Sequence, residues 1–292
     1  MREFAGKVAV VTGAAGGIGR ALADRCAREG MRVVLADVAE APLAAAEREL
    51  RATGAMALAV PTDVSRAADV EALAERTLDA FGGVHLLCNN AGFGGGGRIW
   101  EATLADWERV VGVTLFGVVH GVRTFVPLML RQGEAAHVVN TASLAGLVSY
   151  HTSGLYQVTK HAVVALSETL HHELAQAGAS VKVSVLCPGW VETAMTARIR
   201  PLLEPPQHGG DATPGALDET ARRAWTRLAR EGIGPERVAD LVFAAIRDEQ
   251  FYILPHPEHN AIIQQRTDAI LRGYDPPNAF ALLAAEQDKG RV

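Results

Sequence analysis

Short runs of β-branched and other apolar residues alternate with longer helical patterns, and this alternation limits the fold more than any other feature of the sequence. Seven runs have the length and composition of strands: Lys7–Thr12, Arg32–Asp37, Ala55–Pro61, Val84–Asn89, Ala136–Thr141, Val181–Cys187 and Gln250–Leu254. The first six lack in/out alternation, as expected of strands buried on both faces. Helical patterns lie between them, over Gly17–Glu29, Pro42–Thr53, Ala67–Phe81, Leu104–Arg131 and Gly154–Ala177. Repeated β-α-β units with short connections predict an α/β fold, a doubly wound and mostly parallel sheet covered by helices on both faces.

Two segments depart from this rhythm. The stretch from about residue 190 to 234 is long, rich in Pro and Arg and without a strand, which is typical of a lid or binding loop. Its apolar residues form either a lid over a sizeable substrate or the buried face of a lid helix; they are Trp190, Met195, Ile199, Leu202 and Leu203. After residue 255 only a short helix, Glu258–Arg272, is expected. We therefore expect one domain over residues 1–255, with the lid at about 190–234, and a C-terminal extension over 256–292.

Composition excludes several partners. The 292 residues carry a net charge of −5, which gives no reason to expect nucleic acid or an anionic membrane surface. The N-terminus lacks the pattern of a secretory signal, and no apolar run approaches the roughly 18–20 residues that cross a bilayer. Three widely spaced cysteines without a pairing pattern fit reduced thiols. We expect a cytoplasmic protein whose partner is a small-molecule substrate.

A glycine-rich turn joins the first predicted strand to the first helix, in the sequence Thr12-Gly-Ala-Ala-Gly-Gly-Ile-Gly19. Glycines allow the backbone to turn tightly and approach a pyrophosphate, and the helix N-terminus supplies free N–H groups. A plain tight turn is the alternative.

Asp37 ends the second strand, where a carboxylate accepts both ribose hydroxyls of an adenosine and repels a 2′-phosphate. Because Val38 follows rather than Arg, the sequence favours NAD over NADP; the alternative for Asp37 is a helix N-cap.

Further residues follow the third and fourth strands. Asp63 could lie near an adenine amino group, and an N-cap of the next helix is the alternative. Asn89-Asn90-Ala91-Gly92 ends the fourth strand, where a buried asparagine can tie neighbouring strands together.

Tyr156 and Lys160 are spaced i, i+4 on a predicted helix, hence on one face. A neighbouring ammonium, together with the charged ring of NAD⁺, favours the phenolate. One cation about 5 Å from the phenol, at an effective dielectric near 20, supplies about 3 kcal/mol, roughly two pKa units. A tyrosine could then act as a general base around pH 8. A surface pair is the alternative.

Ser143 follows the fifth strand, at the edge of the sheet where doubly wound folds bind ligands, and its hydroxyl can hold a substrate oxygen. After the sixth strand, Pro188–Thr193 can present backbone groups and a hydroxyl to a nicotinamide carboxamide.

Together, these motifs in this order resemble those of the short-chain dehydrogenase/reductase family over about residues 5–255. The resemblance implies a Rossmann-like sheet of about seven strands, a nicotinamide cofactor and catalysis by Ser143, Tyr156 and Lys160, with the tyrosine moving the proton. The residues that we expect to contact NAD are Gly13, Gly17, Ile18, Gly19, Asp37, Asp63, Val64, Asn90, Ala91, Gly92, Tyr156, Lys160, Pro188, Gly189, Val191 and Thr193. Family members form dimers or tetramers, and the apolar content of Leu104–Arg131 and Gly154–Ala177 suits burial against a partner subunit.

Thr114 marks a departure from the family. Relatives commonly carry an asparagine there, which helps to hold a water that relays protons to the lysine. A threonine hydroxyl can hold a water, but its reach and donor pattern differ from those of an amide. We therefore count Thr114 with the catalytic residues and expect its effect on rate and pH profile, not on reaction class.

Histidines offer weaker hypotheses. His171-His172 and His256-Pro-Glu-His259 lack the spacing of a known zinc site, so we expect no metal. His151 precedes Tyr156 at the expected pocket mouth and, with Trp190, is a candidate substrate contact; a solvated loop histidine is the alternative. Residues 251–258 resemble bacterial relatives that act on aryl or terpenoid secondary alcohols.

The sequence therefore predicts an NAD-linked oxidoreductase acting on a secondary alcohol or ketone of medium to large apolar size. An NADPH-linked ketone reductase is the alternative within the same class. A nucleotide-binding sensor without turnover is the alternative from another class, favoured only by Thr114. Neither the substrate and its stereochemistry nor the direction of reaction follows from the sequence.

Overall fold

The fold is built on one seven-stranded parallel sheet with strand order β3-β2-β1-β4-β5-β6-β7. The computed structural model describes residues 1–95, 97–203 and 217–289. The strands are β1 (Val8–Thr12), β2 (Arg32–Asp37), β3 (Ala57–Pro61), β4 (Leu86–Asn89), β5 (Ala136–Thr141), β6 (Val181–Leu186) and β7 (Tyr252–Ile253). This confirms the predicted Rossmann-like α/β fold. The chain reverses direction of winding between β1 and β4, which creates a crevice at the carboxyl edge of the sheet.

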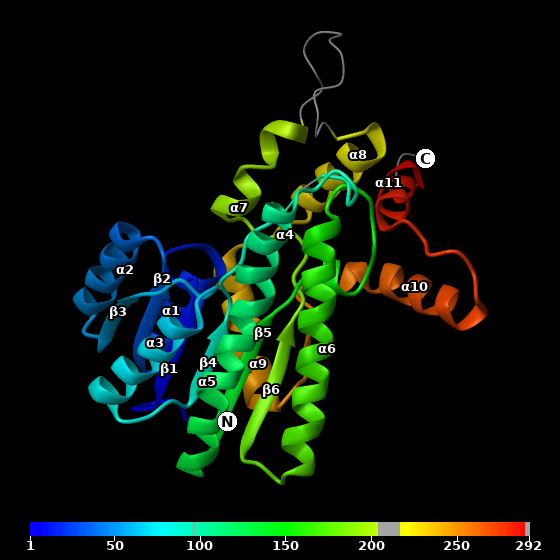
Figure 1. Ribbon diagram of the computed structural model, residues 1–292. Coiled ribbons are helices and arrows are strands. Elements are labelled where there is room, and N and C mark those ends of the chain that lie inside the picture. The colour runs from blue at the N-terminus through cyan, green and yellow to red at the C-terminus, as the bar shows by residue number, and fades with distance from the viewer. Residues whose placement is uncertain (96, 204–216, 290–292) are drawn as a thin grey trace.

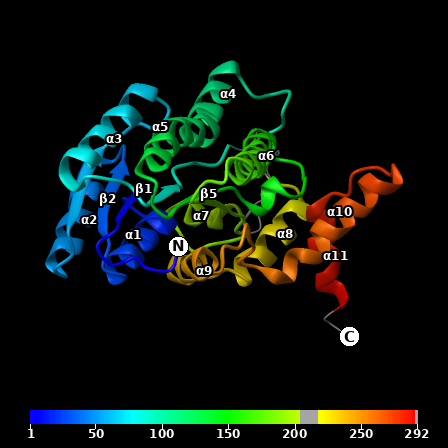
Figure 2. The ribbon, with the colours of Figure 1, turned by 90° about the horizontal axis from the view of Figure 1, so that it is seen from below.

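Helices cover both faces of the sheet (Figures 1 and 2). One face carries α1 (Gly17–Arg28), α2 (Glu40–Ala52) and α9 (Pro235–Asp248), and the other carries α3 (Ala67–Phe81), α5 (Gly117–Gln132) and α6 (Gly154–Gln176). The central strands β1, β4 and β5 are buried at every position, so both faces contribute to two large apolar cores. This double burial explains the near-continuous apolar strands of the sequence. Predicted strand ends extend up to two residues too far, most clearly at β7, an edge strand that pairs only with β6.

The long helix expected over Leu104–Arg131 is not uniform. It comprises α4 (Leu104–Val111), a π-helical turn over Gly112–Phe116 and then α5. By length and composition this 29-residue helix could cross a membrane, so the expectation that no apolar segment reaches that length is wrong. Core helices of soluble proteins pass the same test, and one side of α5 packs against the sheet through Phe125 and Met129.

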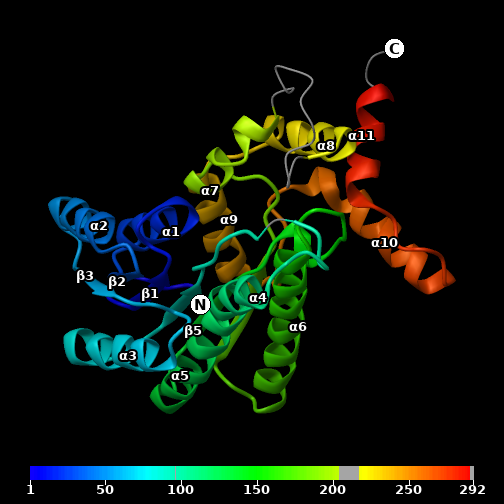
Figure 3. The same ribbon diagram turned by 45° about the horizontal axis from the view of Figure 1, so that its top comes forward.

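A second group of elements lies over the carboxyl edge of the sheet, and we call it the cap (Figure 3). It consists of α7 (Ala194–Ala197), a 3₁₀ turn (Arg200–Leu203), α8 (Glu219–Arg230), a second 3₁₀ turn (Pro257–His259), α10 (Asn260–Arg272) and α11 (Ala279–Lys289). Helices α8 and α11 pack together around a third apolar core. The lid prediction falls partly on residues 204–216, and the side chain of Leu202 also lies outside the described part. The division at residue 255 stays a prediction, and α8 and α11 are elements that the sequence patterns had not suggested.

Candidate functional site

The carboxyl ends of β1 and β4 are held together at the crevice. The Thr12 hydroxyl accepts the backbone N–H groups of Asn90 at 2.9 Å and Ala91 at 3.0 Å, and the Asn90 amide donates to the Thr12 carbonyl at 3.0 Å. Gly13 has a positive φ of 67°, and a Cβ there would lie 2.9 Å from the Ala91 Cα. Two segments predicted to form a cofactor wall are therefore in direct contact. The strand tie expected at Asn89 is also present, because its amide donates to Asn140 on β5 at 2.9 Å.

Helix α1 begins at this crevice with no side-chain cap. Its N-cap, Gly16, has none to offer, so the N–H groups of the first turn are free of capping side chains. Gly19 is fixed by packing, since a Cβ there would lie 2.1 Å from the Gly13 carbonyl oxygen. A Cβ on Gly17 would lie 3.1 Å from the Thr193 methyl group, which places the turn after β6 against the glycine-rich turn. Ile18 is half-buried against the core. An uncapped helix N-terminus closed in by small residues fits a pyrophosphate.

Asp37 lies at the carboxyl end of β2, beside the glycine-rich turn. One oxygen accepts the N–H of Ala15, in the glycine-rich turn, at 3.1 Å, and the other accepts the N–H of Ala39 at 3.0 Å. The N-cap of α2 is Ala39, so Asp37 does not cap that helix. Val38 beside it is 71% exposed.

The segment after β3 turns over the next part of the crevice. Asp63 accepts both the N–H, at 3.0 Å, and the hydroxyl, at 2.7 Å, of Ser65. Helix α3 has Arg66 as its N-cap, so the capping alternative for Asp63 is not found. Val64 is buried, and a Cβ on Gly117 of α5 would lie 2.8 Å from it.

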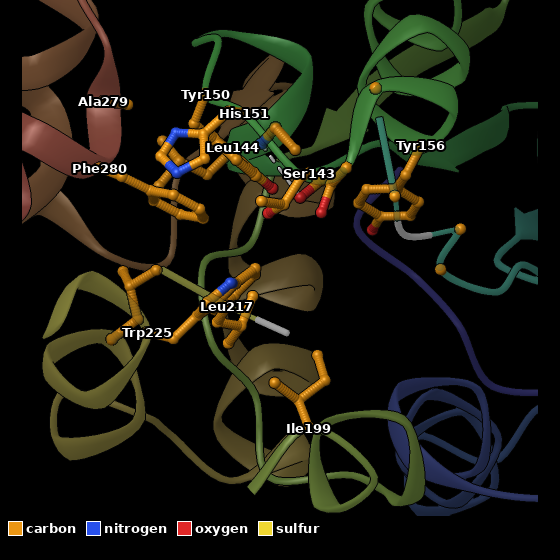
Figure 4. Close-up of a pocket in the computed structure, with 18 of the residues that line it drawn as sticks. Ser143, Leu144, Tyr150, His151, Tyr156, Ile199, Leu217, Trp225, Ala279 and Phe280 are labelled. Carbon is orange, nitrogen blue, oxygen red and sulfur yellow. Dashed lines mark hydrogen bonds between the residues drawn. The ribbon is translucent and has the colours of Figure 1, made fainter. Parts of the chain in front are cut away.

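Ser143, Tyr156 and Lys160 converge at the carboxyl end of β5, where the first two line one cavity (Figure 4). The Lys160 Nζ donates to the Thr141 carbonyl at 2.6 Å and lies 5.6 Å from the centre of the Tyr156 ring. The Ser143 hydroxyl accepts the Ala145 N–H at 3.1 Å and donates to the Pro188 carbonyl at 3.4 Å. Within the predicted i, i+4 pair, Lys160 is buried and Tyr156 is partly buried at the cavity, so the surface-pair alternative is wrong.

Burial dominates the ionisation of this group. It raises the pKa of Tyr156, with a hydrogen bond from Ser143 acting in the opposite direction, and it lowers the pKa of Lys160 to about 8. The lysine therefore does not by itself lower the pKa of Tyr156, and the contribution expected from the charged NAD⁺ ring stays a prediction. Each charged form loses water on burial, and this loss is the largest cause of both shifts. A further positive charge near the phenol is needed to lower its pKa.

Thr114 is fully buried within the π-helical turn. Its hydroxyl donates to the Phe93 carbonyl at 3.3 Å. A Cβ on Gly92 would lie 3.7 Å from both the Lys160 Nζ and the Thr114 methyl group, so Gly92 separates these two side chains. Thr114 is therefore close to the lysine.

The cavity has a volume of about 1340 Å³ and extends from Ser143 and Tyr156 into the cap. Both residues suggested as substrate contacts line it. His151 has its Nε2 2.7 Å from the Asp218 carboxylate and its Nδ1 3.0 Å from the Asn278 amide nitrogen, so it joins the β5–α6 loop to both sides of the cap. Trp190 is only 1% exposed, and its ring contacts Trp225.

Sequence reasoning missed an aromatic group in the same cavity. Tyr150 stacks on Phe280 of α11, with ring centres 4.1 Å apart, and Trp225 of α8 lies edge-on to both rings. The backbone N–H of Ala279 donates to the Ser149 carbonyl at 3.0 Å, which fixes α11 to the loop before α6. Apolar residues at helical spacing over 221–228 and 279–284 were the available signal.

The histidines near the end of β7 have structural partners. His256 Nδ1 accepts the Gly189 N–H at 3.1 Å and its Nε2 donates to the Trp190 carbonyl at 3.0 Å, which fixes the Pro188–Gly189 turn. Glu231, Glu258 and His259 place their ligand atoms within 4.8 Å of one another, but Glu231 already accepts from Arg227 and lies 3.1 Å from the His259 ring nitrogen. The absence of a metal stays a prediction.

Comparisons with known proteins agree with this geometry. The family described as short chain dehydrogenase matches residues 7–203. Among curated proteins, a CLA biosynthesis dehydrogenase/reductase of Lactiplantibacillus plantarum is 33% identical over 93% of the chain and 95% of its own length. A 1-deoxy-11-beta-hydroxypentalenate dehydrogenase of Streptomyces exfoliatus is 36% identical over 93% of the chain and 90% of its own length.

Solved structures give the same result. A short-chain dehydrogenase/reductase from Burkholderia phymatum in complex with NAD is 48% identical, with a TM-score of 0.86 over 95% of this chain and 99% of its own. An actinorhodin polyketide ketoreductase with NADPH is 31% identical, with a TM-score of 0.74 over 87% of this chain and 97% of its own. With these matches and the convergence of Ser143, Tyr156 and Lys160, the chain belongs to the short-chain dehydrogenase/reductase family of oxidoreductases.

Proposed function

We propose that the protein transfers a hydride between NAD and a secondary alcohol or ketone that has a medium to large apolar body. The observation that carries the choice of cofactor is Asp37. Its carboxylate ends β2 at the crevice, is held by two backbone N–H groups and lies next to the exposed apolar side chain of Val38. A negative charge here accepts ribose hydroxyls and repels a 2′-phosphate.

The chain offers a complete set of contacts for the cofactor. The uncapped start of α1 would hold the pyrophosphate, and Asp63 and Val64 would border the adenine. Asn90–Gly92 and the turn over Pro188–Thr193 border the nicotinamide. When bound, the nicotinamide ring takes or gives the hydride and, in its oxidised form, adds a positive charge near the Tyr156 phenol.

Tyr156 moves the proton at the substrate oxygen, and Ser143 holds that oxygen in place. At 3.4 Å the Ser143 bond to the Pro188 carbonyl is long and weak, so the hydroxyl can rotate to donate to a substrate. The Thr141 carbonyl holds the Lys160 ammonium in place. In this position the ammonium stabilises the Tyr156 phenolate. Thr114 joins the route by which the proton reaches solvent, through its hydroxyl and a water.

The size and lining of the cavity support a large apolar substrate. Small-molecule sites commonly measure about 300–1,000 Å³, so a volume of about 1340 Å³ leaves ample space beyond a nicotinamide ring. Aromatic side chains line the far end. Relatives named for a hydroxypentalenate and for CLA biosynthesis support the same substrate class.

The test is a panel of secondary alcohols that ranges from short aliphatic to aryl and polycyclic members, assayed with NAD⁺ and with NADP⁺ by the absorbance of the reduced cofactor. We expect turnover with NAD⁺ that increases in kcat/KM with apolar size. Lack of turnover across the panel would refute the proposal. Equal kcat/KM for the two cofactors would favour the alternative raised by the NADPH-bound structural relative, an NADPH-linked ketone reductase.

We also propose a cytoplasmic homodimer or homotetramer. Exposed apolar side chains occur along the helices expected at the interface: Leu104, Phe116 and Leu130 on the Leu104–Gln132 helix and Val158 on α6. The three cysteines are free and buried, in keeping with a reducing compartment. Light scattering at micromolar concentration tests the assembly, and a pure monomer would contradict it.

A further inference from the structure

The charges that line the cavity do not balance. The whole chain has a net charge of −5, yet the acidic side chains of the cavity already have partners. Glu101 lies 3.3 Å from Arg98, and Asp218 lies 2.7 Å from His151. After these pairs are set aside, two cations of the described lining remain, Arg109 and Arg198, and neither has an ion pair within the described residues. Even with His151 neutral, the three arginines of the described lining outnumber its two carboxylates, so the cavity has a surplus of one positive charge.

Arg198 follows α7 of the cap and lines the cavity. Met195, Arg198 and Ile199 are spaced i, i+3 and i+4, share one side of α7 and the turn that follows it, and all line the cavity. Arg200, two positions later, does not line the cavity, and its guanidinium donates to both oxygens of Glu192 at 2.7 Å. Both arginines are exposed, but Arg200 is neutralised by Glu192, whereas Arg198 lines the cavity and has no ion pair within the described residues.

Arg109 reaches the same cavity from α4. Its guanidinium lies 4.9 Å from the centre of the Phe93 ring, a contact that leaves the N–H donors along the edge of the guanidinium available. A guanidinium presents paired donors that match the two oxygens of a carboxylate. The apolar chamber beyond, formed by Tyr150, Trp225 and Phe280, offers no counter-charge of its own.

We propose that Arg198, assisted by Arg109, is a carboxylate subsite, and that the natural substrate is a hydroxy acid or keto acid with an apolar body. This inference rests on the proposed function and narrows it. The apolar body fills the aromatic chamber, the reacting oxygen meets Ser143 and Tyr156, and the carboxylate stays at the arginines. A guanidinium could instead bind a cofactor phosphate, and the experiment separates these two anions.

The experiment compares substrates that differ only in the anionic group. Free acids and their methyl esters are assayed with NAD⁺: 4-(1-hydroxyethyl)benzoic acid and 12-hydroxyoctadecanoic acid, with 1-phenylethanol as a neutral reference. Since a hydrogen-bonded charge pair changes affinity by about tenfold or more, we expect kcat/KM about tenfold higher for at least one acid than for its ester. Arg198→Gln should remove that advantage through KM and leave the ester and KM for NAD unchanged. Arg200→Gln is the matched control and should leave all values unchanged.

The outcomes separate this inference from the function on which it rests. Turnover with equal kcat/KM for acids and esters would overturn the carboxylate subsite and leave the dehydrogenase activity standing. No turnover of any acid, ester or neutral alcohol would count against the proposed function itself. An increased KM for NAD in Arg198→Gln, with an unchanged acid-to-ester ratio, would assign the arginine to a cofactor phosphate and overturn the inference.

Discussion

The carboxyl edge of the sheet and the cap above it hold their functional side chains in different ways. At the edge, positions are set by backbone groups: Thr12 to Asn90 and Ala91, and Lys160 to the Thr141 carbonyl. In the cap, side-chain packing, such as that of Phe280 on Tyr150 of the β5–α6 loop, adds to the backbone bond from Ala279 to the Ser149 carbonyl. Backbone geometry tolerates few substitutions, whereas aromatic packing accepts other apolar shapes. We therefore expect the edge to determine the reaction and the cap to select the substrate.

The sharpest test of the edge is Tyr156→Phe, which removes the hydroxyl and keeps the ring. We expect kcat to fall by about two to four orders of magnitude because general acid–base catalysis is lost. NAD binding, followed by titration, should be nearly unchanged. Tyr274→Phe, at a tyrosine that is 67% exposed, is the control and should retain full activity. A Tyr156→Phe enzyme with a tenth of the normal rate would remove the tyrosine from its role.

Asp37 tests the edge at its cofactor end. Asp37→Ala removes the acceptor of the ribose hydroxyls and the repulsion of a 2′-phosphate, so the preference for NAD should fall by about ten- to a hundredfold. The measurement is the ratio of kcat/KM for NAD⁺ to that for NADP⁺. Asp37→Asn keeps the shape and removes only the charge, and it should fall between wild type and Asp37→Ala. An unchanged ratio in both variants would place the discrimination elsewhere.

Thr114 is fully buried near the edge, and it stands where the family resemblance implies an asparagine. Thr114→Val should reduce kcat by about tenfold and shift the pH–rate profile if the hydroxyl takes part in proton transfer. KM for NAD should hardly change. Thr77→Val is matched, because Thr77 is equally buried and also donates to a backbone carbonyl, but on the distant helix α3. If the two variants behave alike in rate and pH profile, Thr114 is a packing residue.

The smallest effect is expected in the cap. Phe280→Ala removes an aromatic contact of Tyr150 and should reduce kcat/KM for aryl and polycyclic alcohols by about two- to tenfold. The values of kcat/KM for short alcohols and of KM for NAD should stay unchanged. Leu271→Ala, in the same extension but 79% exposed, controls for loss of folding. Equal losses on short and large alcohols would show that the cap acts on the catalytic residues, and the contrast between edge and cap would then be wrong.

The sequence predicted the edge far better than the cap for a physical reason. Glycine turns, a strand-ending aspartate and an i, i+4 pair owe their function to local backbone geometry, which spacing along the chain reveals. The contacts of Tyr150 with Trp225 and Phe280 join segments distant in sequence, and no short pattern encodes them. The pKa of Tyr156 also escaped prediction, because burial, and not the neighbouring lysine, determines its direction. The sequence predicted a helix over this apolar segment, but it did not predict the π-helical turn over Gly112–Phe116.

The pairing of Trp190 with Trp225 gives the protein an optical property. The chain has four tryptophans, and these two lie in contact beside the cavity, with ring centres 5.7 Å apart, whereas Trp100 at the rim is 78% exposed. Indole emission depends on the polarity around the ring, so the inner pair and the rim residue should emit at different wavelengths. A molecule that enters past Trp100 and displaces water next to the inner pair changes both signals. Occupation of the chamber can thus be followed by the protein's intrinsic fluorescence, without turnover and without a label.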